Sequence, residues 1–250
     1  MSGFSISNPR YRKLLVLTGL LKCIKERYPE DCVIVASQST VTLDFIGRHL
    51  SSNGIGPLSR IDGDTKNRQR ILDNFNGYVL LISARVCGVG LNLTKANRII
   101  IYEPSWNPAV DDQTAARVWR TGQFKQVYIY RLALQGCLDE RIIQRQLHKI
   151  QLSTLVGDQY CFSNSMNRDE LRRLVELELG CPSTTHQILN CTKCTDTLIN
   201  EIPINNPSLD NIEQWLHTVP ENLSKIKNIE ELCLDNTENM LSFVFLNQLC

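Results

Sequence analysis

Long hydrophobic runs are missing from this 250-residue sequence. No apolar stretch reaches the roughly 20 residues that a membrane-spanning helix needs. The N-terminal segment MSGFSISNPRYRKLL also lacks the apolar core of a secretory signal peptide. These absences predict an intracellular protein that has no membrane partner. The composition, with 42% hydrophobic and 21% charged residues, is ordinary for a globular chain.

Close pairs of cysteine are also scarce, although the chain contains 10 cysteines. Most stand singly in apolar segments, where cysteine behaves as a small hydrophobic residue; examples are Cys23, Cys32, Cys87 and Cys233. Cys191 and Cys194 alone form a C-x-x-C pair. This pair is therefore the one place where cysteine spacing indicates a metal site.

Positive charge is depleted in the last fifth of the chain. Residues 201–250 contain 2 Lys/Arg against 8 Asp/Glu, whereas residues 1–200 contain 25 against 18. The net charge of +1 hides this asymmetry. A basic body followed by an acidic tail suits a polyanion-binding domain joined to a different module.

The first 135 residues alternate between segments with helical spacing and short apolar runs. Helices are predicted over 11–28, 40–54 and 65–76, and strands over 31–37, 78–83, 97–104 and 126–134. Apolar strands separated by helices predict an α/β fold, a parallel sheet with helices on both faces. Ligands of such sheets bind beyond the carboxyl ends of the strands. The polar residues expected at that edge are Ser37, Ser83, Arg85 and Glu103.

A glutamine and two arginines recur at helical spacing in DDQTAARVWRTGQ, residues 111–123. We expect a helix here, with one of the two leading aspartates as N-cap and the glycine at its end. On that helix Gln113, Arg117 and Arg120 would share one face. Two guanidinium groups on one face repel unless an anion lies between them, and arginine holds phosphate oxygens bidentately. A solvated basic face is the alternative.

Beyond residue 135 the pattern is less regular. Helices are predicted over 138–158 and 167–180, and the Pro- and Asn-rich segment 199–210 has the composition of a linker. Asp139-Glu140 superficially matches a D-E metal-binding box, but it begins a helix and is interpreted as an N-terminal carboxylate pair. No G-x-x-x-x-G-K-[ST] phosphate loop occurs in the sequence.

A family resemblance is carried by residues 83–108, SARVCGVGLNLTKANRIIIYEPSWNP, and by the arginine segment after them. The glycine-rich turn, the strand, the WNP tripeptide and D-x-Q-x-x-x-R-x-x-R-x-G-Q resemble, in order and spacing, the second RecA-like lobe of Swi/Snf-type superfamily-two helicases. Upstream, VIVASQSTVTLDFIGRHL and RIDGDTKNRQRILDNFN resemble the lobe's opening strand and helix and its DG-containing segment. Downstream, RVWRTGQFKQVYIYRLALQGCLDERIIQRQLHKIQLSTLV and the tail are similar to the recombinational-repair translocases known as Rad-fifty-four proteins. The resemblance implies a lobe with its closing helix over 1–158 and an irregular, partly helical extension over 159–250.

The resemblance also implies a shared ATP site. In this family ATP with Mg²⁺ lies between two lobes, and the second lobe supplies cations that complete the site. By this match Arg117 and Arg120 are arginine fingers and Gln113 orients the nucleotide or the attacking water. The turn residues that would approach the nucleotide are Gly88, Gly90 and Asn92. Cys87 stands where the family has a glycine, and we expect it to crowd the turn.

Contacts with DNA phosphates are implied for the same strand-end surface. The matching positions are Ser37, Gln38, Ser83 and Arg85, with Trp106 and Asn107 in the WNP loop. Such contacts carry no sequence information, as a translocating motor requires. For Trp106 a packed aromatic that closes the strand is the alternative. Arg98 and Arg131 are expected to be structural.

Zinc ligands are predicted in the tail. The spacing of His186, Cys191 and Cys194 is that of zinc ligands, and a tetrahedral site needs a fourth. Cys181 is nearer in sequence, but His217 aligns better with a histidine of the resembling tail and is preferred. Free thiols without metal are the alternative.

The sequence therefore predicts the C-terminal motor lobe of an ATP-dependent double-stranded DNA translocase that acts in homologous recombination in the nucleus. The implied partners are double-stranded DNA, a first RecA-like ATPase lobe in cis or in trans, and the strand-exchange recombinase filament. Because it lacks the phosphate loop, the isolated chain is expected to be inactive. A lobe of a nucleosome-remodelling ATPase and a non-catalytic DNA- or partner-binding remnant are the alternatives.

Overall fold

The computed structural model describes residues 9–88, 90–156, 168–177, 183–188, 216–218 and 244–246. They fall into two compact units, of which the first holds residues 9–132 and the second the described residues from 133 onward. The domain boundary predicted at residue 158 stays a prediction. Within the described ranges, no helix is both long and apolar enough to cross a membrane.

The first unit is built on a five-stranded parallel sheet with the order β2-β3-β1-β4-β5. Its strands are β1 (Val33–Ser37), β2 (Leu58–Ile61), β3 (Val79–Ser83), β4 (Arg98–Ile101) and β5 (Tyr128–Arg131). Every residue of β1, β3 and β4 is buried, which is why these strands read as continuous apolar runs. The predicted α/β fold with a parallel sheet is confirmed.

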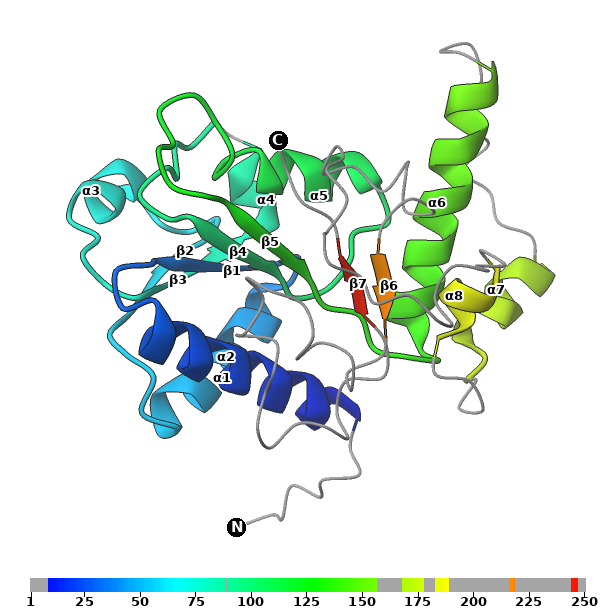
Figure 1. The fold of residues 1–250 in the computed structure, drawn as a ribbon, viewed down its shortest axis with the longest axis horizontal. Coiled ribbons are helices and arrows are strands. Elements are labelled where there is room, and N and C mark those ends of the chain that lie inside the picture. The colour runs from blue at the N-terminus through cyan, green and yellow to red at the C-terminus, as the bar shows by residue number, and fades with distance from the viewer. Residues whose placement is uncertain are drawn as a thin grey trace. The chain divides into compact units, whose positions relative to one another are not determined.

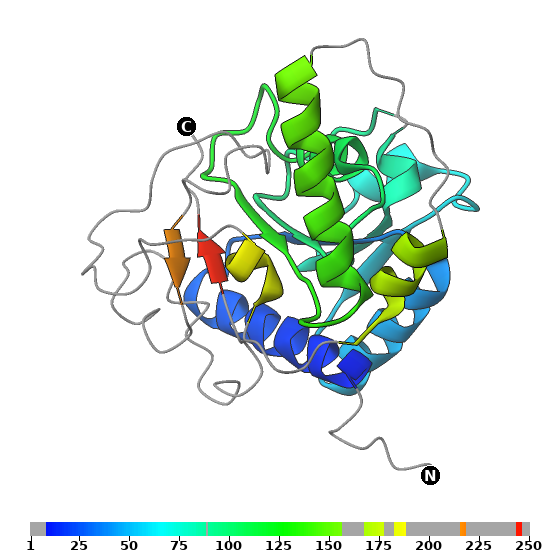
Figure 2. The same cartoon turned by 90° about the vertical axis from the view of Figure 1, so that its right-hand side faces the viewer.

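Helices cover both faces of this sheet (Figure 1). The first unit contains α1 (Pro9–Arg27), α2 (Thr40–Ser52), α3 (Arg68–Asp73), α4 (Ala84–Cys87) and α5 (Pro108–Ala115). The pair α1 and α2 lies on the side opposite α3, α4 and α5, and Figure 2 shows that pair together after a quarter turn. A buried cluster joins Ile34 and Ile99 of the sheet to Leu72 of α3 and Val86 of α4.

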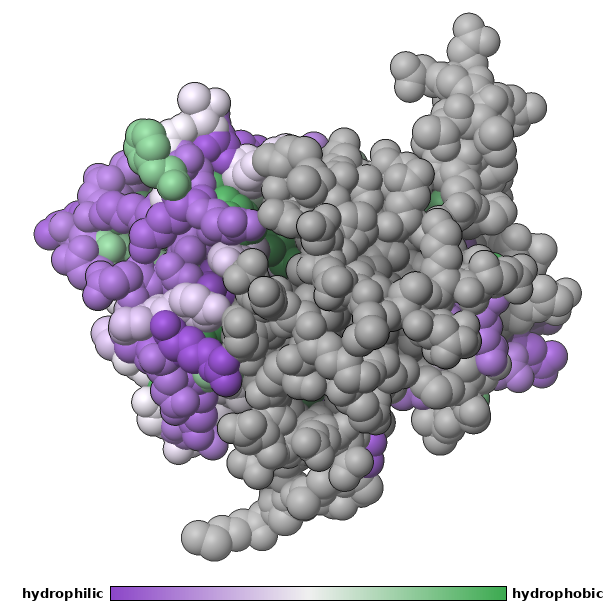
Figure 3. All heavy atoms as spheres, in the orientation of Figure 1, coloured by the Kyte–Doolittle hydropathy of each residue, from purple (hydrophilic) through white to green (hydrophobic). Residues whose placement is uncertain are grey.

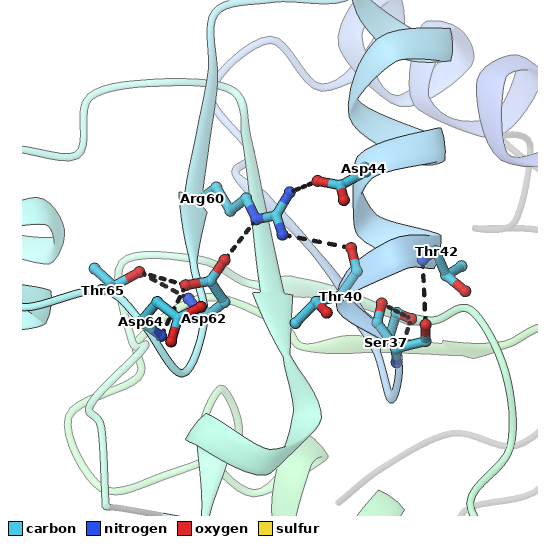
Figure 4. A network of polar contacts seen from close by, with 9 residues as sticks. Ser37, Thr40, Thr42, Asp44, Arg60, Asp62, Asp64 and Thr65 are labelled. Carbon is cyan, nitrogen blue, oxygen red and sulfur yellow. Dashed lines mark hydrogen bonds and ion pairs between the residues drawn. The ribbon is translucent and has the colours of Figure 1, made fainter.

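Strand β2 has no counterpart in the sequence prediction, because its residues LSRI lack both an apolar run and a clean alternation. A polar network fixes it instead (Figure 4). Arg60 on β2 pairs with Asp44 of α2, and its Nε donates to Asp62 Oδ2 over 2.8 Å. Asp62 Oδ1 accepts from Thr65 Oγ1 over 2.9 Å. The turn after β2 is therefore held to α2 by side chains rather than by apolar packing.

Exposed hydrophobic side chains in the first unit are few, and two of them, Val41 and Phe45, lie one turn apart on α2. The largest exposed fractions belong to Phe124 at 98% and Val41 at 60%. The described surface visible in Figure 3 is mainly hydrophilic, with isolated hydrophobic residues. Scattered exposed hydrophobic residues are normal on globular proteins, so this face shows no broad apolar patch among its described residues.

The second unit contains α6 (Leu138–Val156), α7 (Arg168–Val175) and α8 (Thr184–Ile188). It also contains an antiparallel pair, β6 (Leu216–Thr218) and β7 (Val244–Leu246), in which His217 is opposite Phe245. The helix predicted over 138–158 is confirmed in its described part. The helix predicted over 167–180 is confirmed only as far as Val175, because residues 176 and 177 are described and are not helical.

The start of α6 shows what Asp139-Glu140 does. Asp139 Oδ2 accepts from the backbone N–H of Leu134 over 3.2 Å, and Glu140 Oε2 accepts from that of Gly136 over 2.8 Å. Glu140 Oε1 accepts from the backbone N–H of Thr185 over 2.9 Å and so also holds the start of α8. Burial raises the pKa of Glu140, but these hydrogen bonds outweigh it and leave the pKa below its usual value. The interpretation as a helix N-terminal carboxylate pair is confirmed.

Candidate nucleotide and nucleic-acid interface

The carboxyl ends of β1 and β3 bring two predicted residues together. Ser37 and Ser83 are directly paired in the parallel register, as expected for polar residues at one edge of the sheet. Both are nearly fully buried, at 1% and 2% exposure. Arg85, two residues beyond β3 in α4, is exposed. Of these three predicted DNA contacts, Arg85 is therefore the one that already faces solvent.

Glu103, which follows β4, holds the turn between β1 and α2. Its Oε1 accepts from Ser37 Oγ over 2.7 Å and from the backbone N–H groups of Gln38 and Ser39 over 3.1 and 3.3 Å. Ser39 is the N-cap of α2, and its side chain accepts from the backbone N–H of Thr42 over 3.3 Å. The predicted residues Ser37 and Gln38 thus lie where the chain leaves β1, at a turn that is anchored by a carboxylate from the segment after β4.

The WNP loop connects β4 to α5. Trp106 is 50% exposed, so it is not the fully packed aromatic of the alternative interpretation. Asn107 is the N-cap of α5, and its Oδ1 accepts from the backbone N–H of Ala109 over 3.3 Å. Buried Asp111 accepts from the backbone N–H of Ser105 with both carboxylate oxygens, over 3.2 and 3.0 Å. The helix after the loop therefore fixes the loop.

The expected helix over the arginine segment is wrong in its bounds. α5 spans Pro108–Ala115, begins at Asn107 rather than at an aspartate, and includes Gln113 but neither arginine. The reason is local, because an N-capping asparagine followed by proline at the first helical position is a strong start signal. Past Ala116 the chain turns, and the three side chains do not share one helix face.

The turn after α5 packs against the glycine-rich turn. Arg117 Nε donates to the backbone carbonyl of Cys87 over 2.7 Å, and the backbone N–H of Leu93 donates to the carbonyl of Arg117 over 3.1 Å. Arg120 is exposed, and its guanidinium has no hydrogen bond or ion pair within the described residues. The two arginines thus differ. Arg117 holds the neighbouring turn by a hydrogen bond, and the guanidinium of Arg120 is exposed to solvent.

The glycine-rich turn differs from the expectation of a crowded loop. Cys87 is the last residue of α4 and is fully buried in the core, so its side chain lies in packed space rather than inside a tight turn. Burial raises the pKa of the Cys87 thiol to about 12, although Arg117 and Thr114 oppose this. Gly90 has φ of +83°, a conformation that favours glycine. Gly88 is in the right-handed region and does not need that freedom.

Asn92 and the two other arginines have mainly local partners. Asn92 is exposed, and its Oδ1 accepts from the backbone N–H of Thr94 over 3.3 Å. Arg98 is fully buried between the rings of Tyr28 and Tyr128, and its Nε donates to Asp31 over 2.7 Å. Arg131 Nη2 pairs with Asp112 over 2.8 Å. The structural roles expected for Arg98 and Arg131 are confirmed.

Half of the predicted zinc ligands can be placed. His186 lies in α8 and His217 in β6, whereas Cys191 and Cys194 lie outside the described residues, as does Cys181. Burial lowers the pKa of His186, which favours the neutral imidazole that a metal needs. Among the described residues, no three His, Cys, Asp or Glu side chains form a metal-binding group. The zinc site stays a prediction.

Comparison with known proteins identifies the class. Residues 12–122 match the family model of the helicase conserved C-terminal domain. This span includes the sheet strands β1 to β4, the glycine-rich turn and both arginines. Residues 12–122 therefore form a helicase conserved C-terminal domain, and the lobe that contains them is of the Swi/Snf type.

Within that class the chain is similar to recombination proteins. It is 36% identical over 214 residues to the DNA repair and recombination protein RAD54-like of Drosophila grimshawi, an alignment that covers 82% of this chain and 27% of that protein. It is 38% identical over 192 residues to the DNA repair protein rhp54 of Schizosaccharomyces pombe, covering 74% and 22%. The chain thus spans about a quarter of the length of the curated relatives it matches.

A solved structure supports the fold. The crystal structure of the C-terminal part of the Fun30 ATPase domain superposes with a TM-score of 0.51 at 30% identity, covering 63% of this chain and 47% of that one. Together with the parallel sheet, this match confirms the RecA-like architecture that the sequence predicted.

Proposed function

We propose that this chain is the C-terminal motor lobe of an ATP-dependent double-stranded DNA translocase that acts in homologous recombination in the nucleus. Its relatives are named for DNA repair and recombination, and the matched solved structure is part of an ATPase domain. Its proposed partners are duplex DNA, a first RecA-like lobe in cis or in trans, and the strand-exchange recombinase filament. The observation that carries the proposal is the hydrogen bond between Arg117 and Cys87, which joins the arginine segment to the glycine-rich turn.

The proposed ATP site uses this junction. ATP with Mg²⁺, held mainly by the first lobe, would supply the phosphoryl group that is transferred to water. Arg120, exposed and unengaged among the described residues, would stabilise the charge that develops on the γ-phosphate. Arg117 uses its Nε to brace the turn, which leaves its terminal nitrogens for the same phosphate. Exposed Gln113 would orient the nucleotide or the attacking water.

The turn residues have complementary roles in this proposal. Gly90, whose positive φ a side chain would strain, and exposed Gly88 let the backbone approach the nucleotide closely. Asn92 caps its own turn through Thr94 and so keeps that backbone in place. Nucleotide binding therefore rests on backbone shape here, and charge stabilisation rests on the arginines.

The proposed DNA surface is the carboxyl edge of the sheet. Arg85 and Trp106 are exposed there, and a guanidinium is well suited to a backbone phosphate. Gln38 is half-buried in the anchored turn, and Asn107 is exposed but already caps α5. Ser37 and Ser83 lie beneath this surface, so they support it rather than reach far from it.

We propose in addition that the tail binds one structural zinc ion through His186, Cys191, Cys194 and His217. The support is the ligand spacing together with the neutral form that burial favours for His186.

The function is tested by joining this chain to the first ATPase lobe of a RAD54-like relative. We expect ATP hydrolysis that duplex DNA stimulates, together with displacement of a triplex-forming strand ahead of the motor. Stimulation by nucleosomes well above that by bare duplex would instead favour a remodelling lobe. A joined protein that folds and binds DNA but hydrolyses no ATP would favour a non-catalytic remnant.

A further inference from the structure

We propose that Glu103 is a positioning residue that fixes the turn between β1 and α2 and links it to the WNP loop. This inference rests on the proposed function of the carboxyl edge as the DNA-contacting surface. Glu103 itself is not proposed to touch DNA.

Three donors converge on one carboxylate oxygen of Glu103. Ser37 Oγ lies 2.7 Å from Glu103 Oε1, and the backbone N–H groups of Gln38 and Ser39 donate to the same atom over 3.1 and 3.3 Å. Hydrogen bonds to an ionised acceptor are roughly twice as strong as neutral ones. Consecutive residues of one turn are therefore tied to a single oxygen atom on the segment that follows β4.

The turn after β1 determines where α2 begins. Ser39 is the N-cap of α2, so the carboxylate fixes the residue at which a 13-residue helix begins. A negative charge near a helix N-terminus is also favourable for the helix dipole. Without Glu103, the backbone N–H of Gln38 would lose its acceptor, and the backbone that positions the Gln38 side chain would no longer be fixed.

Glu103 also connects this turn to the WNP loop. Glu103 stands three residues before Trp106, and buried Asp111 holds the intervening Ser105 through its backbone N–H. Two carboxylates thus hold the part of the loop that precedes Trp106, that of Glu103 through the turn after β1 and that of Asp111 through Ser105. Since Glu103 also holds Gln38, a displacement of one predicted DNA contact is transmitted to the other.

Charge distinguishes a positioning role of Glu103 from simple repulsion between its carboxylate and DNA. The backbone N–H groups of Gln38 and Ser39 are the type of donors that would bind a phosphate at a helix N-terminus, but Glu103 already occupies them. Removing a negative charge normally raises the affinity for DNA. If Glu103 positions the surface, its removal lowers that affinity despite the gain in positive charge.

The experiment compares Glu103→Ala and Glu103→Gln with Glu26→Gln, which removes an exposed carboxylate near the end of α1, before β1 begins, whereas the turn follows β1. The full chain is used, and circular dichroism and thermal melting establish that each variant folds. Amide hydrogen exchange at Gln38 and Ser39, measured without DNA, reports on the turn directly. Binding to a mixed-sequence duplex reports on the surface.

We expect Glu103→Ala to accelerate exchange at Gln38 by about tenfold or more, since its N–H loses a charge-assisted hydrogen bond. The acceleration at Ser39 should be smaller, because its N–H also donates to Ser37 Oγ over 3.1 Å. Duplex affinity should fall several-fold in Glu103→Ala. Glu103→Gln, which keeps an acceptor oxygen, should recover part of both losses, and Glu26→Gln should not change exchange at these amides. A purely structural role would lower the melting temperature without the partial recovery of affinity by Glu103→Gln.

Tighter duplex binding by Glu103→Ala, or exchange at Gln38 and Ser39 equal to that of the wild type, would overturn the positioning role. Failure of the wild-type chain to bind duplex DNA, with exchange still accelerated in Glu103→Ala, would overturn the proposed DNA surface and leave the anchoring of the turn established. If Glu103→Ala does not fold, Glu103→Gln and Ser37→Ala carry the same comparison, because each weakens one part of the anchor.

Discussion

Arg117 Nε and the carbonyl oxygen of Cys87 are joined by a hydrogen bond of 2.7 Å, which ties the segment after α5 to the end of α4. Arg120, three residues further on, has no hydrogen bond or ion pair of its guanidinium in the described part of the chain. Two arginines that look equivalent in the sequence are therefore in different situations. Arg117 is hydrogen-bonded within the lobe, whereas the exposed guanidinium of Arg120 is available to bind an anion.

This difference predicts that substitution of Arg117 lowers the stability of the chain, whereas substitution of Arg120 lowers only the rate of ATP hydrolysis. Arg117→Ala should lower the free energy of unfolding of the chain by about 1 kcal/mol, because a part-buried carbonyl loses its donor. Arg120→Ala should leave it nearly unchanged. Joined to a first lobe, Arg120→Ala should lower kcat by about a thousandfold, as the loss of an arginine finger does. Denaturant unfolding and steady-state ATP hydrolysis measure the two effects, with Arg70→Ala on α3 as the control. A normal kcat in Arg120→Ala would support the alternative that Arg120 belongs to a solvated basic face.

The isolated chain should not hydrolyse ATP at a measurable rate. No phosphate loop is present in its sequence, so nothing takes the place of the loop's backbone and lysine around the β- and γ-phosphates. The measurement is phosphate release by residues 1–250 with saturating duplex DNA. DNA-stimulated release that Arg120→Ala abolishes would contradict the prediction, because it would place a complete site in this chain.

Arg85 should contribute to DNA binding without reading sequence. Its exposed guanidinium at the strand-end surface predicts that Arg85→Ala weakens binding to all duplex sequences alike. The slope of the logarithm of affinity against the logarithm of salt concentration should flatten by about one unit. Fluorescence anisotropy at several salt concentrations with two unrelated duplexes tests both statements. Arg48→Ala, an exposed arginine on α2, serves as the control. A loss confined to one duplex would indicate base readout instead.

The contact between α1 and α2 should be sensitive to acid. His49 Nε2 lies 3.0 Å from Thr18 Oγ1, and burial lowers the pKa of His49 below its usual 6.5. The folded form then binds fewer protons than the unfolded form, so stability is intact above pH 6.5 and falls as the pH drops below it. His186 shifts in the same direction and adds to this slope. Denaturant midpoints at pH 7.5 and 5.5 should differ less in His49→Gln than in the wild type. Equal differences would show that His49 does not contribute.

Zinc in the tail should be detectable by elemental analysis as one ion per chain. His217→Ala should lose the metal and Cys181→Ala should keep it, and chelation should destabilise the tail while the sheet stays folded. The reverse pattern in the two variants would make Cys181 the fourth ligand. A metal-free wild type would remove the site and leave His217 as an ordinary residue of β6.

The sheet was predictable because its inner strands are buried on both faces, and continuous apolar runs such as VIVAS and VLLIS are unambiguous. β2 was not, because Arg60 pairs with residues on two other segments that no local pattern reveals. The helix over the arginine segment was predicted wrongly because one local pattern overrode another. Its helical spacing was real, but the stronger start signal at Asn107 and Pro108 moved the helix toward the N-terminus.

The candidate site was predictable as a set of positions, but not as a set of contacts. The carboxyl edge was expected to gather Ser37, Ser83 and Glu103, and it does. That Glu103 holds the turn after β1 depends on β1 and β4 being neighbours, and strand order is a long-range property. The roles of Asp111 and Asn107 in the WNP loop depend likewise on where α5 begins.

The strand order also sets the spacing of the proposed contacts along DNA. β3 and β4 flank β1, so their carboxyl ends are two strand spacings apart, or about 10 Å. Arg85 after β3 and the WNP loop after β4 would then hold phosphates that are a fixed number of nucleotides apart. A sheet cannot stretch without breaking its hydrogen bonds, so the lobe's footprint is constant. In the proposed motor, each step along the strand would therefore come from movement of the whole lobe as a rigid body.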